Sequence, residues 1–201
     1  SCSSNISCTK LARYLHDNKQ PGYEFLYGIP GTIAGAVSMN AGAFEREIMP
    51  YVHSLDLLDE NGTIYTLKNN EISYSYRTSN INEKSIIISV KLFKQTSNFD
   101  MNLLNLLNQK RKISQPINQL SCGCIFKNPD SISAGKLVEE LGLKGKSEGG
   151  AMVSIEHGNF IVNKGGATAG DFLKLIEHIR QRAYDERGID LKTEVQIIGS
   201  V

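Results

Sequence analysis

The sequence lacks several features that would point to common partners or compartments. Its net charge is only +1, from 22 Lys and Arg against 21 Asp and Glu, so nothing indicates nucleic acid or an anionic membrane as a partner. No apolar run approaches the roughly 20 residues that cross a bilayer. The N-terminus, SCSSNISCTK, has neither an apolar signal core nor an initiator Met. We therefore expect a cytosolic protein with a further piece upstream.

Metal-ligand spacing is also lacking. Cys2, Cys8, Cys122 and Cys124 are spaced C-x5-C and C-x-C, which matches no common zinc pattern, and the four histidines are scattered. Without a signal sequence, reduced thiols are expected. We therefore predict no metal site.

What the sequence does have is a stretch with very little side-chain bulk, YGIPGTIAGAVSMNAGAF at 27–44. Glycine in such numbers costs conformational entropy, which favours a backbone that approaches a partner closely. Pro30 stands where a first helical turn could begin, and the N–H groups of such a turn suit a phosphate or an electron-rich ring. On residue types alone, a tightly packed turn without a ligand is the alternative.

The residue pattern of the remaining chain predicts a β-rich block followed by an α/β second half. The length of the chain allows one large domain or two modest ones. Thr9 is the expected cap of the first helix. Leu103, Leu104, Leu106 and Leu107 are expected to face inward, and the basic residues 110–112 to form a solvated helix end. The expected helices are 9–18, 101–113, 133–141 and 168–187, and the expected strands are 52–58, 63–67, 85–93, 124–127, 159–163 and 194–198.

Three places combine a reactive group with an unusual context. Gly123 frees the backbone before Cys124, whose thiol could be a proton donor, a nucleophile, a redox group or simply a small buried hydrophobe. Arg77 offers a planar fork that suits a carboxylate or phosphate, with a surface ion pair as the alternative. Glu194 begins an otherwise apolar segment, as either a solvated strand end or a buried catalytic carboxylate.

Five motifs in order give these places a common meaning: GIPGTIAGAVSMNAGA, YRTS, GCIFKNP, GGAMVSIEHGNFIVN and EVQIIG. Together they resemble the UDP-N-acetylenolpyruvoylglucosamine reductase family, of the shorter type II branch, from about Pro21 to Val201. That family makes UDP-N-acetylmuramate for bacterial peptidoglycan. The resemblance implies an α+β fold, with the second half of a vanillyl-alcohol-oxidase/PCMH-type FAD-binding domain and a C-terminal α/β substrate-binding domain.

The resemblance also implies the domains and the chemistry. Residues 1–115 would be an incomplete FAD-binding domain, 116–190 the substrate-binding domain, and 191–201 a terminal strand returning to the FAD domain and active site. NADPH would reduce FAD, whose N5 passes hydride to C3 of the enolpyruvyl group before C2 is protonated. The expected protein is a bacterial cytoplasmic monomer that binds a UDP-sugar, and neither nucleic acid nor membrane.

Site residues carry over by position. The implied catalytic residues are Arg77, Cys124 and Glu194. Cys124 falls where most members carry serine as the proton donor, and a thiol, with an ordinary pKa of about 8.5, is a much stronger acid than an alcohol. The implied substrate-binding residues are Tyr76, Lys112, Lys127 and Asn128. The implied FAD-binding residues are Gly28, Ile29, Pro30, Gly31, Thr32, Ala34, Gly35, Ala36, Asn40, Ala41 and Gly42.

One departure from the family leaves other readings open. The family's upstream FAD subdomain, with its Gly-Ser-Asn loop at the pyrophosphate, has no counterpart in residues 1–20. A non-catalytic UDP-sugar-binding fragment without flavin is therefore the alternative function. A different flavin oxidase of the same fold is a third reading, against which GCIFKNP and EVQIIG argue.

Overall fold

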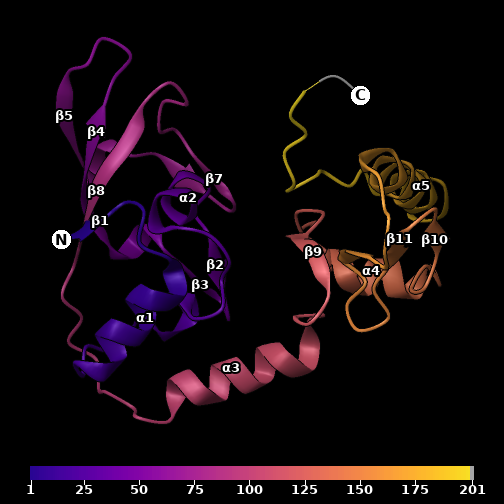
Figure 1. The fold of residues 1–201 in the computed structure, drawn as a ribbon, viewed down its shortest axis with the longest axis horizontal. Coiled ribbons are helices and arrows are strands. Elements are labelled where there is room, and N and C mark those ends of the chain that lie inside the picture. The colour runs from indigo at the N-terminus through magenta and orange to yellow at the C-terminus, as the bar shows by residue number, and fades with distance from the viewer. Residues whose placement is uncertain (200–201) are drawn as a thin grey trace. The chain divides into compact units, whose positions relative to one another are not determined.

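The protein has a mixed α/β fold in two compact units, residues 1–110 and 111–201 (Figure 1). The structure is a computed structural model and describes residues 1–199. Each unit has its own hydrophobic core, and the boundary falls within helix α3, Leu103–Ser114. This organisation confirms the expected fold class, whereas the three-part division at 115 and 190 stays a prediction.

The first unit is built on an antiparallel sheet with strand order β1-β8-β4-β5. The Asn-Gly signal predicted its β4–β5 hairpin correctly, and Gly62 takes the left-handed φ of +82° that such a turn favours. Leu55 and Leu57 point into the core from β4, where Val90 of β8 joins them. The strands are β1 Cys2–Ser3, β4 Val52–Leu58, β5 Ile64–Lys68 and β8 Ile86–Leu92.

Two helices and two small hairpins complete this unit. Ser7, not Thr9, caps the first helix, because its side chain accepts the hydrogen bond from the Lys10 N–H at 3.2 Å. The Thr9 hydroxyl instead accepts a hydrogen bond from the Gly28 N–H at 3.1 Å. The helices are α1 Cys8–Asp17 and α2 Ile33–Ser38; the hairpins pair β2 Gly42–Ala43 with β3 Arg46–Glu47, and β6 Tyr74–Ser75 with β7 Thr78–Ser79. A 3-10 turn, Glu24–Leu26, leads into the glycine-rich stretch.

The second unit is an antiparallel sheet of order β10-β11-β12-β9 with α5 packed on β10 and β11. The capping signals predicted its helices well: Ser133 caps α4, Thr168 and Asp171 form a capping box on α5, and Gly188 ends α5 with a φ of +65°. The elements are β9 Leu120–Cys124, α4 Ala134–Glu140, β10 Ser147–Glu148, β11 Ala151–Val153, β12 Phe160–Asn163 and α5 Ala169–Arg187.

Several sequence-based expectations were wrong in detail. The strand expected at 124–127 ends at Cys124 instead. No strand forms at 194–198, because the Glu194 and Val195 N–H groups both donate to the Ile125 carbonyl and no ladder continues beyond them. Residues 200 and 201 of the predicted terminal strand lie outside the described residues.

Helix α3 also differs from its prediction. Leu104 and Leu107 are buried as expected, but Leu106 is exposed and Leu103 only half-buried. Arg111 is only 8% exposed, so the expected solvated basic end was wrong for that residue. Within residues 1–199, no helix combines the length and apolar character that a membrane span requires.

Candidate functional site

The glycine-rich stretch folds as a loop followed by the short helix α2, which begins at Ile33 and not at Pro30. The first N–H groups of this helix already have partners in the protein. Ile33 donates to the Ile6 carbonyl at 2.9 Å, Ala34 to the Ser4 carbonyl at 3.0 Å, and Gly35 to the Thr32 hydroxyl at 3.3 Å. These three N–H groups are therefore engaged within the protein, while the expectation that the glycine-rich stretch contacts a ligand stays a prediction.

The same stretch nevertheless presents a face with almost no side-chain bulk. Pro30, Gly31 and Gly35 are exposed, while the large residues Ile33 and Val37 point into the core. A Cβ at Gly31 would meet no atom within 4 Å, yet a φ of +99° makes a side chain there strained. A flat group could thus lie directly against this backbone.

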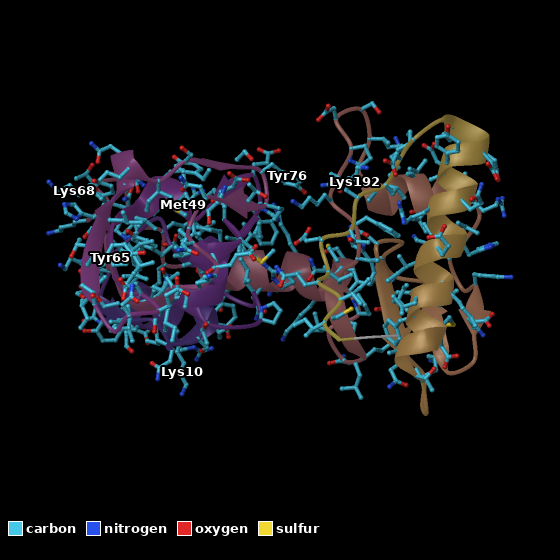
Figure 2. All side chains as sticks on the ribbon, turned by 90° about the horizontal axis from the view of Figure 1, so that it is seen from above. Lys10, Met49, Tyr65, Lys68, Tyr76 and Lys192 are labelled. Carbon is cyan, nitrogen blue, oxygen red and sulfur yellow. The ribbon has the colours of Figure 1, made fainter. Side chains whose placement is uncertain are left out.

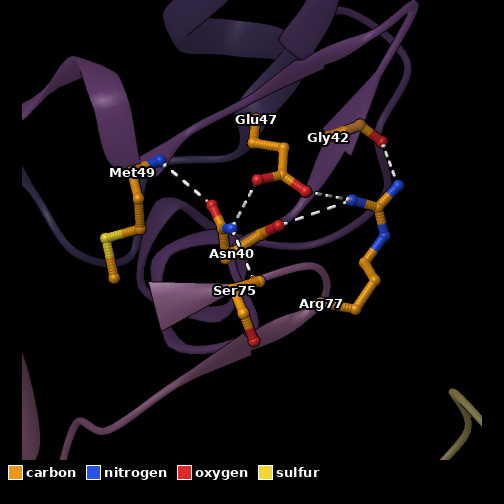
Figure 3. Close-up of polar contacts among 6 residues, drawn as sticks. All are labelled: Asn40, Gly42, Glu47, Met49, Ser75 and Arg77. Atoms are coloured by element: carbon orange, nitrogen blue, oxygen red, sulfur yellow. Dashed lines mark hydrogen bonds and ion pairs between the residues drawn. The ribbon is translucent and has the colours of Figure 1, made fainter. Parts of the chain in front are cut away.

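Arg77 is held against the end of that stretch (Figure 3). Its Nη2 donates to the Gly42 carbonyl at 2.8 Å and its Nη1 to the Asn40 carbonyl at 3.4 Å. The Glu47 carboxylate lies 3.7 Å from Nη1, and the Arg77 side chain is only 16% exposed. The sequence left a surface ion pair as the alternative role of Arg77. The structure shows an ion pair with Glu47, but it is half-buried and accompanied by two hydrogen bonds to backbone carbonyls.

The β6–β7 turn aims this arginine. Arg77 takes a φ of +54°, which non-glycine residues rarely adopt. Tyr76, the other turn residue, lies at the surface of the unit, 42% exposed (Figure 2). The Arg77 guanidinium sits over its ring at 4.8 Å from the centroid, a cation–π contact. Tyr76, predicted to bind substrate, and Arg77, predicted to be catalytic, are therefore in direct contact, while both roles stay predictions.

Gly42 supplies the carbonyl that Arg77 binds, and the hairpin requires a glycine there. A Cβ at this position would lie 2.0 Å from the Arg46 carbonyl oxygen. Asn40 and Ala41, also predicted to bind cofactor, are buried beside it, and the Asn40 amide is engaged within the protein. The structure gives these two residues packing and orienting roles, and their contact with a cofactor stays a prediction.

In the second unit, Cys124 ends β9 directly after a β-bulge. Cys124 pairs with Phe160 and Ser121 with Val162, so Cys122 and Gly123 together oppose one residue of β12. Gly123 takes a φ of +84°. Bulges re-aim the following side chain, and the thiol of Cys124 is half-buried, not fully enclosed. The bulge is thus a local device that sets the direction of the candidate proton donor.

The chain around Glu194 lies directly beside this strand end. Phe126 and Thr193 form a β-bridge, and the Glu194 N–H donates to the Ile125 carbonyl at 2.8 Å. The structure therefore brings the backbones at Cys124 and Glu194 together within the second unit. Arg77 belongs to the first unit.

Asn159 fixes the backbone of Ile125 and Phe126, which directly follows Cys124 and contacts the segment of Glu194. The Phe126 N–H donates to Asn159 Oδ1 at 2.9 Å, and Asn159 Nδ2 donates to the Phe126 carbonyl at 2.8 Å. The Ile125 N–H donates to the Asn159 carbonyl at 2.9 Å. Asn159 is 2% exposed, so water cannot readily replace these bonds.

Replacing Asn159 by alanine should therefore destabilise the second unit. Two buried backbone groups of Phe126 lose their partners, which we expect to cost about 2–4 kcal/mol of unfolding free energy. Chemical denaturation of both proteins measures the loss. Asn163→Ala is the matched control, because its side chain bonds an exposed turn; equal losses in the two variants would contradict the special role of Asn159.

Of the other predicted substrate residues, Lys127 and Asn128 follow strand β9, whereas Lys112 lies on helix α3. Lys112 is exposed on α3, and the Lys127 N–H donates to the Lys192 carbonyl. Asn128 Oδ1 accepts the Ala134 N–H at 3.0 Å, so it supports the start of α4. Burial lowers the pKa of the Arg111 guanidinium, whereas its Coulombic interaction with Cys124 raises it. Arg111 is thus a cation that interacts with Cys124, a role that the sequence alone did not indicate.

Sequence reasoning also missed Glu47 and Asn159. Asn159 lies in the GGAMVSIEHGNFIVN motif and Glu47 lies three residues after the glycine-rich stretch, but neither residue type is unusual at its place in the sequence. Their contacts join segments far apart in the chain, 30 residues from Glu47 to Arg77 and 33 from Asn159 to Phe126, and no local pattern reports such pairs. Among residues 1–199 no group of three or more His, Cys, Asp or Glu side chains is arranged to hold a metal ion.

Comparison with protein families matches both units. Residues 115–198 match the family described as UDP-N-acetylenolpyruvoylglucosamine reductase, C-terminal domain. Residues 4–68 match the family described as FAD binding domain. The first match contains Cys124 and Glu194, and the second contains the whole glycine-rich stretch.

Curated relatives and a solved structure agree with these matches. UDP-N-acetylenolpyruvoylglucosamine reductase of Clostridium botulinum (strain 657 / Type Ba4) is 44% identical over 89% of this chain and 59% of its own length. The Anoxybacillus flavithermus enzyme of the same name is 44% identical over 96% of this chain and 65% of its own length. The crystal structure of the Thermus caldophilus enzyme superposes with a TM-score of 0.83 at 33% identity, covering 94% of this chain and 68% of that one. The chain thus spans about 60% of the length of the curated relatives it matches.

Proposed function

The chain belongs to the UDP-N-acetylenolpyruvoylglucosamine reductase family, and from this we propose that the whole protein reduces UDP-N-acetylenolpyruvoylglucosamine to UDP-N-acetylmuramate. The observation that carries the proposal is the fixed position of Arg77 on the glycine-rich stretch, through the Gly42 carbonyl. The proposed reaction generates an anion that is delocalised onto a carboxylate. A cation fixed at the wall of the site would stabilise that anion. We further propose the bacterial cytoplasm as its location and a monomer as its form.

The residues present fit FAD. The exposed, bulk-free face at Pro30, Gly31 and Gly35 can lie against a flat ring system without a steric clash. We propose that this face, with Gly28, Ile29, Thr32, Ala34 and Gly42, lines the cofactor, while Ala36, Asn40 and Ala41 support it from below. When bound, FAD would supply to C3 of the substrate a hydride taken from NADPH.

The chain's own residues would stabilise the negative charge that develops on the substrate and would supply the proton. After hydride addition, negative charge develops on C2 and the adjoining carboxylate of the substrate. The Arg77 guanidinium would stabilise that charge, and Glu194 would serve as an acid. The Cys124 thiol would then donate its proton to C2, which completes the reduction.

Four further residues would bind the substrate. Tyr76, stacked on Arg77, would contact the substrate near the reacting group. Lys112 and Lys127 would bind the negatively charged diphosphate, since cations suit phosphate groups. The Asn128 Nδ2 would face the sugar while its Oδ1 supports α4.

The activity can be tested on the protein expressed from its complete reading frame. We expect a yellow protein with bound flavin and NADPH oxidation that depends on UDP-N-acetylenolpyruvoylglucosamine. NADPH oxidation that ignores this substrate would contradict the proposal.

The alternative is a UDP-sugar-binding module without flavin, favoured by the separate core of the second unit. Calorimetry on the 201-residue chain with FAD and with UDP-N-acetylglucosamine separates the two. Tight flavin binding by this chain rules the alternative out, and binding of the UDP-sugar alone supports it.

A further inference from the structure

Glu47 links two side chains of the first unit with its two carboxylate oxygens (Figure 3). Its Oε2 accepts a hydrogen bond from Asn40 Nδ2 at 2.7 Å. Its Oε1 lies 3.7 Å from Arg77 Nη1. The family comparisons and the proposed mechanism assign no role to Glu47, yet its carboxylate faces the proposed catalytic cation within the first unit.

Asn40 determines where that carboxylate lies. Its side chain is completely buried, and besides Glu47 it donates to the Ser75 carbonyl at 2.9 Å and accepts the Met49 N–H at 3.2 Å. These three contacts leave the amide one orientation, in which Nδ2 faces Glu47. Asn40 therefore orients Glu47, and Glu47 in turn contacts Arg77.

The backbone around this set is held in uncommon conformations. Within residues 1–199, five non-glycine residues have a positive φ. Four of them belong here: Asn40, Arg77, and the β2–β3 turn residues Phe44 and Glu45. Such conformations persist only where the surrounding contacts over-determine them, and they gather at functional sites. Because the surrounding contacts must hold these backbone conformations in place, we interpret the contact between Glu47 and Arg77 as functional and not incidental.

We propose that Glu47, oriented by Asn40, is a positioning residue for Arg77. Its carboxylate and the Gly42 and Asn40 carbonyls hold the two Nη atoms, which fixes the plane of the guanidinium before substrate arrives. A preorganised cation stabilises developing charge without having to reorient during the reaction. The inference rests on the proposed function of Arg77, but the orientation of the guanidinium can be measured without any activity.

The kinetic test uses Glu47→Gln in the flavin-loaded protein expressed from its complete reading frame. This isosteric change removes the charge that faces Arg77. We expect kcat for substrate reduction to fall about 10- to 100-fold, with KM and the rate of flavin reduction by NADPH little changed. Glu47→Asp, which restores the charge at a shorter reach, should recover part of the loss. Glu45→Gln is the matched control, because it removes the same charge from the exposed turn of the same hairpin.

The second measurement is side-chain ¹⁵N spectroscopy of Arg77, which does not require turnover. In the wild type and in Glu45→Gln we expect slow rotation of the guanidinium, and in Glu47→Gln faster rotation. An inactive wild type would remove the proposed function, while the spectra would still decide the positioning role. Unchanged rotation in a folded Glu47→Gln protein would overturn the inference, as would wild-type kinetics in an active one. If Glu47→Gln does not fold, Glu47→Asp takes its place: its shorter reach should give a smaller increase in the rotation rate, and rotation as slow as in the wild type would overturn the inference.

Discussion

Replacing Cys124 by alanine should lower substrate reduction by about 10²- to 10⁴-fold, the usual contribution of a positioned proton donor. Reduction of the flavin by NADPH should persist, because in the proposed mechanism the thiol acts only after hydride has reached the substrate. Cys124→Ser should keep substantial turnover, since serine offers a proton at the same place. Stopped-flow absorbance of the flavin separates the two half-reactions.

The pH dependence gives a second check on Cys124. A thiol that has lost its proton cannot donate it, so wild-type turnover should fall at alkaline pH, where cysteine thiols ordinarily ionise. This alkaline loss should be absent in Cys124→Ser, because a serine hydroxyl stays protonated in that range. Cys122→Ala, two residues earlier in the bulge, is the matched control and should behave like the wild type. Equal turnover of the wild type, Cys124→Ser and Cys124→Ala would remove Cys124 from the mechanism.

Replacing Arg77 by lysine should cost about 10²- to 10³-fold in kcat for substrate reduction, comparable to the loss of an oxyanion donor. Lysine keeps the charge but has a single ammonium in place of the planar fork. It therefore cannot bind the Gly42 carbonyl with one nitrogen while another faces Asn40 and Glu47. Single-turnover measurements with prereduced flavin would report the loss directly.

Arg46→Lys is the control for this substitution. Arg46 lies in the same small hairpin as Gly42, and its Nη1 donates to the Gly22 carbonyl, away from the proposed chemistry. We expect its turnover to stay within about threefold of the wild type, since exposed polar changes have small effects. Wild-type turnover in Arg77→Lys would show that the fork itself is not required.

Local signals predicted the fold wherever the structure depends on local interactions. The Asn61-Gly62 turn, the Ser133 cap and the Thr168–Asp171 capping box each act within four residues, and each was confirmed. The errors arose where a distant segment decides the outcome. The strand expected at 194–198 did not form, because its first N–H groups share one carbonyl of Ile125, almost 70 residues earlier.

The candidate site shows the same division. The glycine-rich stretch, Arg77 and Cys124 stand out from sequence alone because their residue types are unusual in their surroundings. Glu47, Asn159 and Arg111 do not, because a glutamate in a hairpin or an arginine in a basic helix end is ordinary until tertiary contacts bury it. Their roles follow from burial and from partners about 10 to 30 residues away.

The hydrogen bonds between residues 4–9 and the glycine-rich stretch bear on affinity. Five hydrogen bonds connect them. Ser4, Ile6 and Thr9 accept from Ala34, Ile33 and Gly28, and Cys8 donates to the carbonyls of Gly31 and Thr32 through its N–H and its thiol. The flexible glycines therefore lose their freedom when the chain folds, not when a ligand arrives. A ligand that docks on this face meets an already ordered surface, so little of its contact energy is consumed in ordering the loop. Removing residues 1–9 should therefore lower the affinity for such a ligand, even though none of these residues needs to touch it.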